Sequence, residues 1–587
     1  MKNTDILAEV LSEAGIEDFF AVTGGAAVHI IDSLIRHTQM RAIFHHHEQA
    51  ASLAADAYAR LRNLGVCVVT TGPGVTNAIT GLLCSWQDSV PTIFISGQAR
   101  HTLTALGSPV RQVGTQHLEV IPIVSHLTKK AVMLQPGDDI REVLYELIDL
   151  AQSGRKGPVW LDIPLDLQIQ EYVGQSHKRP KQEYGQSNKI QYQNLEQMQL
   201  DFSRSTRPVM LLGRGIAGLG QEEFNRSLQN LGIPCVRTWG FFDTNLMIPN
   251  DLDFGVVGVS GQRGANKLIS ESDFVISLGA RWGQAVVGPL IHEFVPSATI
   301  HIIDIDEHEL SRLNTTLPNA KTFHADAKET LMSISETFSN NSASNEWLNY
   351  SHSLKEFNSE QKSDVPNDVI DQYALFELLD KHIAKESTIV IDGGGTIVYC
   401  SMQVLTLKSL RKIVIPSASA PMGTGIPHAI GAQVAMSDWS TTLVCGDGSF
   451  PFNLQELQTL ITNHLPIKII IVNNNGYLSI QGTQDQFLDG RQYGSSRLGG
   501  LDIPNFNRIT SAFEIEYNAV RKQSDLETQI SKLLESKVTS VLEVFIKENQ
   551  EIYPRTGFAK NLQGKFDPLP LSEMYPSVKI PNFSQDS

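Results

Sequence analysis

Nine short apolar runs, most of them separated by amphipathic stretches, constrain the fold of this 587-residue chain more than any other feature. Most of the runs are followed by Gly, Pro, Asp or Asn. A strand that is apolar along its whole length is buried on both faces, and its alternation with helices is typical of a parallel sheet. The runs are 66–71, 92–96, 159–163, 209–212, 274–278, 299–303, 388–391, 442–445 and 467–472.

Two polar segments interrupt this alternation. Residues 175–193 are rich in Gln, Lys and Ser, and residues 337–367 are rich in Ser, Asn, Glu and Lys. Both are expected to be linkers, with part of the second forming a solvated helix. The sequence therefore predicts an α/β protein with three doubly wound parallel-sheet domains, at 1–174, 190–336 and 365–550. The Pro-rich tail, 551–587, is expected to wrap the surface, to cover a site as a lid, or to be a frayed end.

The charge and cysteine content exclude several classes of protein. The formal net charge of -16 argues against a nucleic-acid or anionic-membrane binder, although a local site of backbone N–H groups and a metal can still hold phosphate. The five cysteines are scattered without a CxxC pair, which is typical of a reducing compartment. Neither a signal-peptide core nor a run of 18 apolar residues is present, so we expect a cytoplasmic protein without a membrane partner.

The most informative motif combines two strand ends. One apolar run leads into Gly446-Asp447-Gly448, and after a helix-length gap the next ends at Asn473-Asn474. Consecutive parallel strands with a right-handed crossover end at the same edge of a sheet, so Asp447 and Asn474 are expected to converge. A carboxylate, an amide oxygen and a nearby carbonyl suit Mg²⁺, and the glycines let the backbone approach phosphates. The alternative is an ordinary βαβ unit with glycine turns and solvated asparagines.

This pattern resembles the cofactor signature of thiamine-diphosphate (ThDP) enzymes, and the whole chain is similar to their acetolactate synthase branch. The resemblance implies that Asp447, Asn474 and the carbonyl of Gly476 bind Mg²⁺. It also implies a glutamate that hydrogen-bonds the aminopyrimidine ring and promotes loss of the thiazolium C2 proton, a role that needs a low-dielectric pocket. Residues 44–60, FHHHEQAASLAADAYAR, are similar to the family's RHEQgAahaAegYAR and identify Glu48 as this group. A surface glutamate at a helix start is the alternative.

Three histidines, His45, His46 and His47, precede Glu48. Adjacent residues point in different directions, so we do not expect all three to bind one metal ion; one or more can instead face the substrate. In the family, the activating glutamate and the diphosphate site meet across a subunit interface. The resemblance therefore implies a homodimer or homotetramer, with small-molecule substrates and no nucleic acid.

Shorter matches extend the ThDP site that the resemblance implies. Residues 69–78 resemble the family's SGPGatN turn, and residues 113–117 align with its GFQE loop. In that loop Gln116 is retained as a candidate catalytic hydrogen bonder, whereas Thr115 and His117 replace Phe and Glu. Met422 matches the large apolar residue that bends ThDP, with a core methionine as the alternative. The implied cofactor-binding residues are Gly25, Pro73, Asn77, Gly395, Thr396, Met422, Gly446, Gly448, Ser449 and Tyr477.

The middle of the chain is similar to the flavin-binding members of the family. Residues 211–215 form a Gly-rich strand end, which alone is a weak sign of a nucleotide. Residues 254–261, 278–282 and 301–306 resemble lGMlGMHG, iGARFddR and iHIDID. The resemblance implies FAD bound by Arg155, Gly213, Gly215, Gly261, Arg281 and Asp304. Gly283, Gln284 and Ala285 depart from the Asp-Asp-Arg of those members, and the alternative is a central domain kept as a scaffold. A flavin would be structural, because decarboxylation and ligation need no net redox.

The acceptor side departs from the biosynthetic acetolactate synthases. Thr483 stands where they carry Trp, and Ser479 where they carry Met. Smaller side chains leave room for a bulkier acceptor, as in acetolactate-synthase-like carboligases of branched-chain (yersiniose-type) sugar synthesis. We therefore expect transfer of an acetyl unit from pyruvate to an acceptor carbonyl, with a keto-sugar nucleotide as one candidate. The alternatives are acetolactate synthase itself, a pyruvate decarboxylase or oxidase, and a non-catalytic nucleotide-binding partner. The joint presence of Glu48, Asp447 and Asn474 argues against the last of these.

Overall fold

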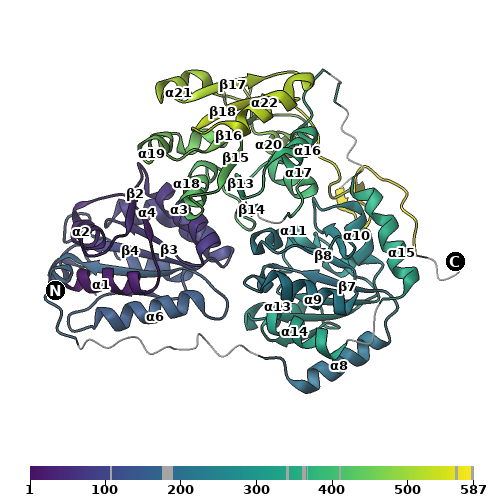
Figure 1. Ribbon diagram of the computed structural model, residues 1–587, viewed down its shortest axis with the longest axis horizontal. Coiled ribbons are helices and arrows are strands. Elements are labelled where there is room, and N and C mark those ends of the chain that lie inside the picture. Colours follow the sequence, from purple (N-terminus) through teal and green to yellow (C-terminus); the bar gives the residue numbers. More distant parts are fainter. Residues whose placement is uncertain are drawn as a thin grey trace.

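The protein contains three six-stranded parallel sheets, one in each third of the chain, and a small antiparallel hairpin near the C-terminus. Figure 1 shows the first domain at lower left, the central domain at lower right and the third domain above them. The α/β class predicted from the buried apolar runs is therefore confirmed. The computed structural model describes residues 1–105, 109–174, 189–338, 343–359, 365–366, 368–408, 411–561 and 566–583.

The first sheet has the strand order β2-β1-β3-β4-β6-β5. One face is covered by α1, α2 and α6, and the other by α3 and α4, as expected for a sheet whose central strands are apolar on both faces. The strands are β1 (Asp18–Ala21), β2 (Arg41–Phe44), β3 (Gly65–Val69), β4 (Thr92–Gln98), β5 (Ala131–Met133) and β6 (Val159–Pro164). The helices are α1 (Asn3–Glu13), α2 (Val28–His37), α3 (Glu48–Arg62), α4 (Pro73–Gln87), α5 (Val120–Val124), α6 (Ile140–Gln152) and α7 (Leu165–Gln168).

The central sheet has the order β12-β11-β10-β7-β8-β9, in which the chain reverses direction across the sheet between β7 and β10. Such a switch point opens a crevice at the carboxyl ends of the strands. The strands are β7 (Pro208–Leu212), β8 (Cys235–Arg237), β9 (Asp253–Val256), β10 (Phe274–Leu278), β11 (Thr299–Asp304) and β12 (Lys321–His324). The helices are α8 (Tyr192–Ser203), α9 (Gln221–Leu231), α10 (Arg263–Ser270), α11 (Gln284–Val287), α12 (Ile291–Phe294), α13 (Glu307–Thr316), α14 (Ala327–Thr337) and α15 (Asn345–Leu354).

The helix α15 corrects the expectation of a solvated helix in a linker. Trp347 is fully buried and its indole Nε1 donates a hydrogen bond to the carbonyl oxygen of Pro208, 3.0 Å away. Leu354 is also buried, in the same core. This polar segment therefore packs against the central domain through a few apolar residues at helical spacing. The other predicted linker, 175–193, lies mostly outside the described residues.

The third sheet has the order β14-β13-β15-β16-β18-β17, which repeats the pattern of the first sheet. In the register of its two middle strands, Gly446 is opposite Val472. The strands are β13 (Ser387–Ile391), β14 (Arg411–Val414), β15 (Ser440–Gly446), β16 (Lys468–Asn473), β17 (Glu516–Val520) and β18 (Ser540–Phe545). The helices are α16 (Gln372–His382), α17 (Thr396–Val404), α18 (Gly425–Ala435), α19 (Glu456–Thr462), α20 (Leu478–Phe487), α21 (Phe506–Ala512) and α22 (Gln523–Glu535).

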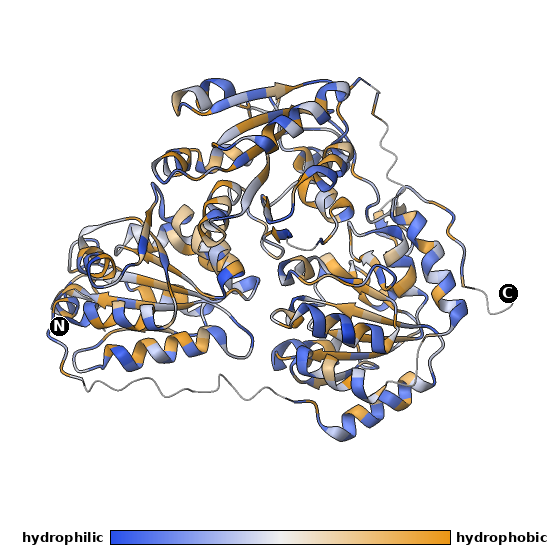
Figure 2. Ribbon diagram, in the orientation of Figure 1, coloured by the Kyte–Doolittle hydropathy of each residue, from blue (hydrophilic) through white to orange (hydrophobic). Residues whose placement is uncertain are grey.

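The first and third domains share one hydrophobic core, in which α3 packs against α18. A Cβ added at Gly431 would lie 2.0 Å from the carbonyl oxygen of Ala54, so the two helix backbones approach closely. The alanines of α3 permit this approach. Figure 2 shows hydrophobic colouring concentrated in the strands and hydrophilic colouring on the outer helices. No helix in the described part of the chain is both long and apolar enough to span a membrane.

The described part of the C-terminal tail runs along the central domain (Figure 1). It contains the hairpin of β19 (Phe558–Lys560) and β20 (Phe566–Pro568). Leu571 and Met574 are buried, and the ring of Phe583 packs edge-on against Trp347 with 5.3 Å between centroids. The tail thus wraps the central domain along these residues.

Candidate functional site

The carboxyl ends of β15 and β16 bring three oxygen-bearing groups together. Asp447 and Asn474 lie just past the ends of these adjacent strands. One terminal atom of the Asn474 amide lies 3.1 Å from Asp447 Oδ1 and 2.9 Å from the carbonyl oxygen of Gly476. A Cβ at Gly476, where φ is 150°, would lie 2.5 Å from the carbonyl oxygen of Ser495, so only glycine fits this turn.

The chemistry of this group of atoms fits a divalent cation. When the amide oxygen of Asn474 faces Asp447 and Gly476, three oxygens point at one another, which is the ligand type that Mg²⁺ prefers; when the amide nitrogen faces them, it donates to both oxygens. Burial raises the pKa of Asp447 to about 7, although the backbone N–H groups of Gly476 and Gly448 donate to the carboxylate. A bound cation would favour the charged form. Among the described residues no group of three or more His, Cys, Asp or Glu could hold a metal, and this site contains a single carboxylate.

Glycine turns surround this oxygen group. A Cβ at Gly448 would lie 2.3 Å from the ring of Tyr477, so the ring lies close against the backbone there. Ser449 Oγ accepts a hydrogen bond from the backbone N–H of Gly423 at 2.7 Å. Gly446 has no atom within 4 Å of an added Cβ and therefore faces open space. These turns leave room for a phosphate group beside the carboxylate.

A second loop approaches from β13. Gly395 has a positive φ of 76° and immediately precedes α17, whose first residue, Thr396, donates its hydroxyl to Gln372 Oε1 at 3.1 Å. Met422 is half-buried, and its Cγ lies 3.6 Å from the position of a Cβ at Gly394. The methionine therefore lies at the surface of this loop rather than in a closed core.

Glu48 begins α3 and is half-buried. Its Oε2 accepts a hydrogen bond from Asn77 Nδ2 at 2.9 Å. A Cβ at Gly74 would lie 3.5 Å from Glu48 Oε1, and the neighbouring Pro73 is the first residue of α4. The turn that resembles SGPGatN thus forms one wall beside the Glu48 carboxylate, and Asn77 contacts that carboxylate directly.

Gln116 lies in a backbone conformation that is uncommon for a residue with a side chain. Its φ is 58°, and its side chain is exposed. Its carbonyl oxygen accepts a hydrogen bond from Thr71 Oγ1 at 3.2 Å, and a Cβ at Gly72 would lie only 2.6 Å from that oxygen. Positive φ at a non-glycine residue is concentrated at functional sites. Gly25 is exposed, with no atom within 4 Å of an added Cβ.

The three histidines before Glu48 point in different directions. The His45 side chain is buried and its Nδ1 lies 2.8 Å from Glu456 Oε2. His47 Nδ1 accepts a hydrogen bond from the backbone N–H of Gln49 at 3.1 Å, which caps α3. His46 is exposed. The His45 ring thus contacts the third domain, and the His47 ring caps α3.

A cavity of about 750 Å³ lies where the three domains meet, at the switch point of the central sheet. Its volume suits a large ligand, and basic side chains on its wall suit an anionic one. The lining includes Arg155, Lys156, Arg214, Gly215, Arg281, Gly283, Gln284, Ala285, Asp304 and Lys328. Burial raises the pKa of Asp304 to about 6 and lowers the pKa of Lys156. The cavity therefore has the volume for a dinucleotide and basic side chains that could contact its phosphates.

Two of the glycines predicted to bind FAD lie outside the lining of this cavity. Gly213 and Gly261 are not among the residues that line the cavity. A Cβ at Gly213 would lie 2.2 Å from the carbonyl oxygen of Gly279, and one at Gly261 would lie 2.6 Å from the carbonyl oxygen of Val256. Both glycines allow close packing of backbone segments. The sequence motif alone does not distinguish a glycine that packs in this way from one that contacts a ligand.

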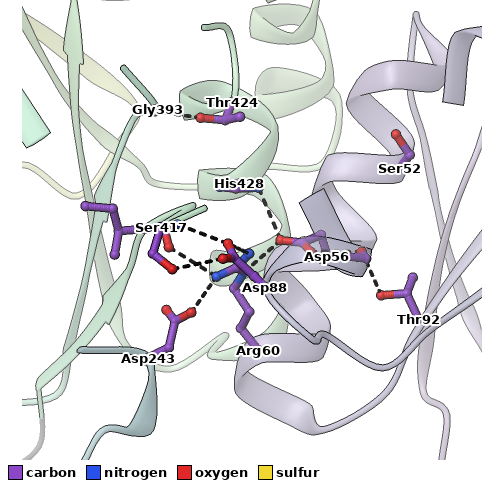
Figure 3. Close-up of polar contacts among 12 residues, drawn as sticks. Ser52, Asp56, Arg60, Asp88, Thr92, Asp243, Gly393, Ser417, Thr424 and His428 are labelled. Carbon is purple, nitrogen blue, oxygen red and sulfur yellow. Dashed lines mark hydrogen bonds and ion pairs between the residues drawn. The ribbon is translucent and has the colours of Figure 1, made fainter. Parts of the chain in front are cut away.

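A buried ionic cluster adjoins this cavity (Figure 3). The Arg60 guanidinium contacts Asp56 and Asp88 at 2.7 Å each and also pairs with Asp243 of the central domain. It donates a further hydrogen bond to the carbonyl oxygen of Ile415 in the third domain. Burial opposes ionisation of Asp56, but the charge of Arg60 outweighs it and holds the pKa of Asp56 well below its usual range. One side chain of α3 thus connects all three domains.

Comparisons with known proteins agree with this geometry. Models of the N-terminal, central and C-terminal domains of thiamine pyrophosphate enzymes match residues 1–121, 197–334 and 393–544. The chain belongs to the ThDP enzyme family. It is 30% identical to acetolactate synthase 2 of Zea mays over 581 residues, which cover 94% of this chain and 86% of that protein. It is also 28% identical to the acetolactate synthase large subunit of Lactococcus lactis over 558 residues, with coverage of 94% and 93%.

The protein is therefore an enzyme with ThDP-dependent chemistry of the acetolactate synthase type. In this ThDP enzyme, sequence reasoning missed two buried carboxylates near the site. Asp392 Oδ1 accepts hydrogen bonds from Thr424 Oγ1 at 2.7 Å and from the Gly425 N–H at 2.9 Å, and so holds the loop that carries Met422. Glu456 contacts His45. The only sequence signal for Asp392 was its place at the end of an apolar run.

Proposed function

We propose that this ThDP enzyme decarboxylates pyruvate and transfers the resulting two-carbon unit to an acceptor carbonyl. The observation that carries the proposal is the converging oxygen group of Asp447, Asn474 and Gly476 on a chain that also holds Glu48 against Asn77. The relatives named acetolactate synthases, in plants and bacteria, support the same donor chemistry.

The residues of the site divide into two half-sites. Asp447, Asn474 and the Gly476 carbonyl would hold Mg²⁺, and Gly446, Gly448, Ser449 and the turn at Gly395 and Thr396 would surround the diphosphate, with Tyr477 packed behind it. Bound ThDP supplies the electron sink for decarboxylation. Glu48, held by Asn77, would hydrogen-bond the aminopyrimidine, with Gly25 and Pro73 beside it, and Met422 would support the bent cofactor. Gln116 would hydrogen-bond the reacting substrate.

A homodimer or homotetramer would bring the two half-sites of different subunits together. Four large apolar side chains on and after α20 support such an interface, because each of them would lose contact with water if it were covered by a second subunit. Ile480, Phe487, Tyr493 and Leu498 are all exposed in the single chain. Sedimentation measurements across a range of concentrations would test this, and an active monomer would exclude it.

FAD is the ligand that we propose for the central cavity. The basic lining and the position at the switch point support a dinucleotide, with Arg155, Gly215, Arg281 and Asp304 as contacts. Arg155 is already paired with Asp306. Release of a flavin from the denatured purified enzyme, identified by absorbance and mass spectrometry, would support the assignment, and a colourless active enzyme would exclude it.

The identity of the acceptor distinguishes two forms of the proposed function. Thr483 is exposed on α20, and its hydroxyl donates to the carbonyl oxygen of Ser479 at 2.9 Å. These two small side chains favour an acceptor larger than pyruvate, such as a keto-sugar nucleotide, whereas the named relatives favour pyruvate itself and acetolactate as product. Thr483→Trp is expected to narrow the acceptor range towards small 2-oxo acids. An unchanged range in this variant would exclude the open acceptor site.

The deciding experiment supplies pyruvate, ThDP and Mg²⁺ with a panel of carbonyl acceptors and identifies the products by mass spectrometry. A ligated product is expected, and its identity reports the acceptor. Glu48→Gln is the matched control: it is expected to bind ThDP and to lose turnover. Aldehyde or peroxide as the main product would instead identify a decarboxylase or an oxidase.

A further inference from the structure

We propose that His45 and Glu456 are positioning residues that fix the Glu48 carboxylate through the third domain of the same chain. The inference rests on the proposed role of Glu48 as the group that hydrogen-bonds the aminopyrimidine. It assigns a task to the first residue of the His45–His47 run and to a buried carboxylate of α19.

The pair is fully enclosed. His45 and Glu456 side chains have no exposed surface, and His45 Nδ1 lies 2.8 Å from Glu456 Oε2. Burial alone would raise the pKa of Glu456, but the hydrogen bond and charge of His45 outweigh burial, so the pKa lies below its usual value. Glu456 is therefore an anion at neutral pH, and His45 Nδ1 donates to it. Thr459 Oγ1 donates to the same oxygen at 2.7 Å.

The second oxygen of Glu456 holds the backbone immediately before Glu48. Glu456 Oε1 accepts a hydrogen bond from the His46 N–H at 3.1 Å. One carboxylate thus fixes a side chain three residues before Glu48 and a backbone group two residues before it. Charge-assisted hydrogen bonds of this kind are stronger than neutral ones and fix geometry as well as position.

A further contact with the third domain lies on the other side of Glu48, at Gln49. Asn453, the last residue of η7 (Phe450–Asn453), donates from Nδ2 to Gln49 Oε1 at 3.2 Å and to the carbonyl oxygen of Gly423 at 2.7 Å. The start of α3 is therefore held on both sides of Glu48 by the segment that follows Asp447. Glu48 itself has one hydrogen bond to the wall of its own domain, from Asn77.

This arrangement makes the Glu48 position sensitive to Glu456. The first turn of a helix lacks internal partners for its N–H groups, so its direction depends on the contacts that precede it. A displacement of about 1 Å in a reacting group can lower a rate by about 100-fold. Loss of the carboxylate at position 456 is therefore expected to affect the chemical step more than the binding of cofactor or substrate.

The test uses the full-length enzyme with ThDP and Mg²⁺. Glu456→Gln keeps the size of the side chain and an oxygen for the His46 N–H, but it removes the charge that orients His45. We expect kcat and the rate of hydrogen–deuterium exchange at C2 of bound ThDP to fall at least about tenfold, with ThDP affinity and the KM for pyruvate changed less than about twofold. C2 exchange, followed by NMR after acid quench, reports the Glu48 step alone.

Arg62→Gln is the matched control. Arg62 lies at the other end of α3 and donates from Nε to the carbonyl oxygen of Ala435 in the third domain at 2.8 Å, so this variant also removes one contact between the two domains. It is expected to leave C2 exchange unchanged. Equal losses in both variants, or a loss in Glu456→Gln that follows ThDP affinity and thermal stability, would show an ordinary domain contact and overturn the proposal.

Two variants of His45 test the proposal even if Glu456→Gln does not fold. His45→Asn can place an amide N–H near the position of Nδ1 and is expected to retain most of the exchange rate, whereas His45→Phe is expected to lose it. Equal rates in these two variants would overturn the proposal. The double variant Glu48→Gln/Glu456→Gln is expected to exchange no more slowly than Glu48→Gln. Normal exchange in Glu48→Gln alone would instead overturn the role of Glu48, which separates the two failures.

Discussion

Two buried groups of acidic oxygens in this protein differ in how their charge is balanced. Around Arg60, the carboxylates of Asp56, Asp88 and Asp243 share a guanidinium supplied by the chain itself. Around Asp447, the neighbours are backbone N–H groups and the amide of Asn474, and burial raises its pKa to about 7. The first group contains its own cation and links the three domains. In the second group we propose that Mg²⁺ balances the charge, and this would distinguish a binding site from a structural cluster.

The largest effect is expected from Asp447→Asn. The substitution keeps the shape of the side chain and removes the one charge that the group offers to Mg²⁺. We expect kcat/KM to fall by about 1000-fold or more, because several kcal/mol of electrostatic interaction are lost. The apo variant should unfold at the same or a higher temperature than the apo wild type, since a buried carboxylate without a cation has been removed.

The measurements are turnover at saturating Mg²⁺ and thermal unfolding without ligands. A variant that keeps activity would mean that Asp447 is not a metal ligand. A variant that loses stability in the apo form would place Asp447 with the structural carboxylates around Arg60, and the contrast between the two groups would be lost.

Arg60→Met, in contrast to Asp447→Asn, is expected to lower the stability of the protein. The substitution leaves three buried carboxylates without their shared cation, and breaking a buried pair in this way costs about 3–5 kcal/mol. The protein has three domains, so the readout is the lowest-temperature transition in calorimetry rather than a single unfolding free energy. Arg62→Met, on the same helix, removes one contact to the Ala435 carbonyl and is the control. Equal shifts for both arginines would contradict a special place for Arg60.

The sequence predicted more of the fold than of these clusters, for a physical reason. Apolar runs report burial residue by residue, so the three parallel sheets followed from them, and the turns beside Asp447 and Glu48 carry local motifs. The partners of Arg60 and Glu456 are fixed only by the packing of separate domains, and His45 meets Glu456 across 411 positions of sequence. No local sequence pattern identifies a contact between residues so far apart in the chain. The same limit explains Trp347, whose indole hydrogen-bonds Pro208 across 139 positions of sequence.

Asp162 is a buried carboxylate of a third kind, because its hydrogen-bond donors are neutral. Ser96 Oγ donates to it at 2.5 Å and Gln98 Nε2 at 2.9 Å. Burial nevertheless raises its pKa to about 7 from an ordinary 3.8. Between these values the folded state binds more protons than the unfolded state, so this group contributes stability at pH below about 4 that is lost as the pH rises through about 7.

Asp162→Asn is therefore expected to flatten the pH dependence of stability. The difference between the variant and the wild type should move in favour of the variant as the pH rises from about 4 to 7, as measured by thermal unfolding of the apo proteins in a series of buffers. The Asp56 carboxyl, whose pKa Arg60 holds low, contributes only a small change of the opposite sign near the lower end of this interval. A pH-independent difference between Asp162→Asn and the wild type would mean that the carboxyl is ionised throughout.

The smallest effect is expected from Asp243→Asn, the isosteric counterpart of Asp447→Asn in the other cluster. Burial raises the pKa of Asp243 despite Arg60 and Arg214, and its Oδ1 has no hydrogen-bond partner among the described residues. An amide oxygen can still accept from both arginines, while the amide nitrogen takes the place of the unpartnered oxygen. We expect a stability change within about 1 kcal/mol and activity within about twofold of the wild type. The same chemical change would then abolish function at position 447 and leave it intact at position 243, because Asp447 is the carboxylate whose charge the proposed Mg²⁺ would balance.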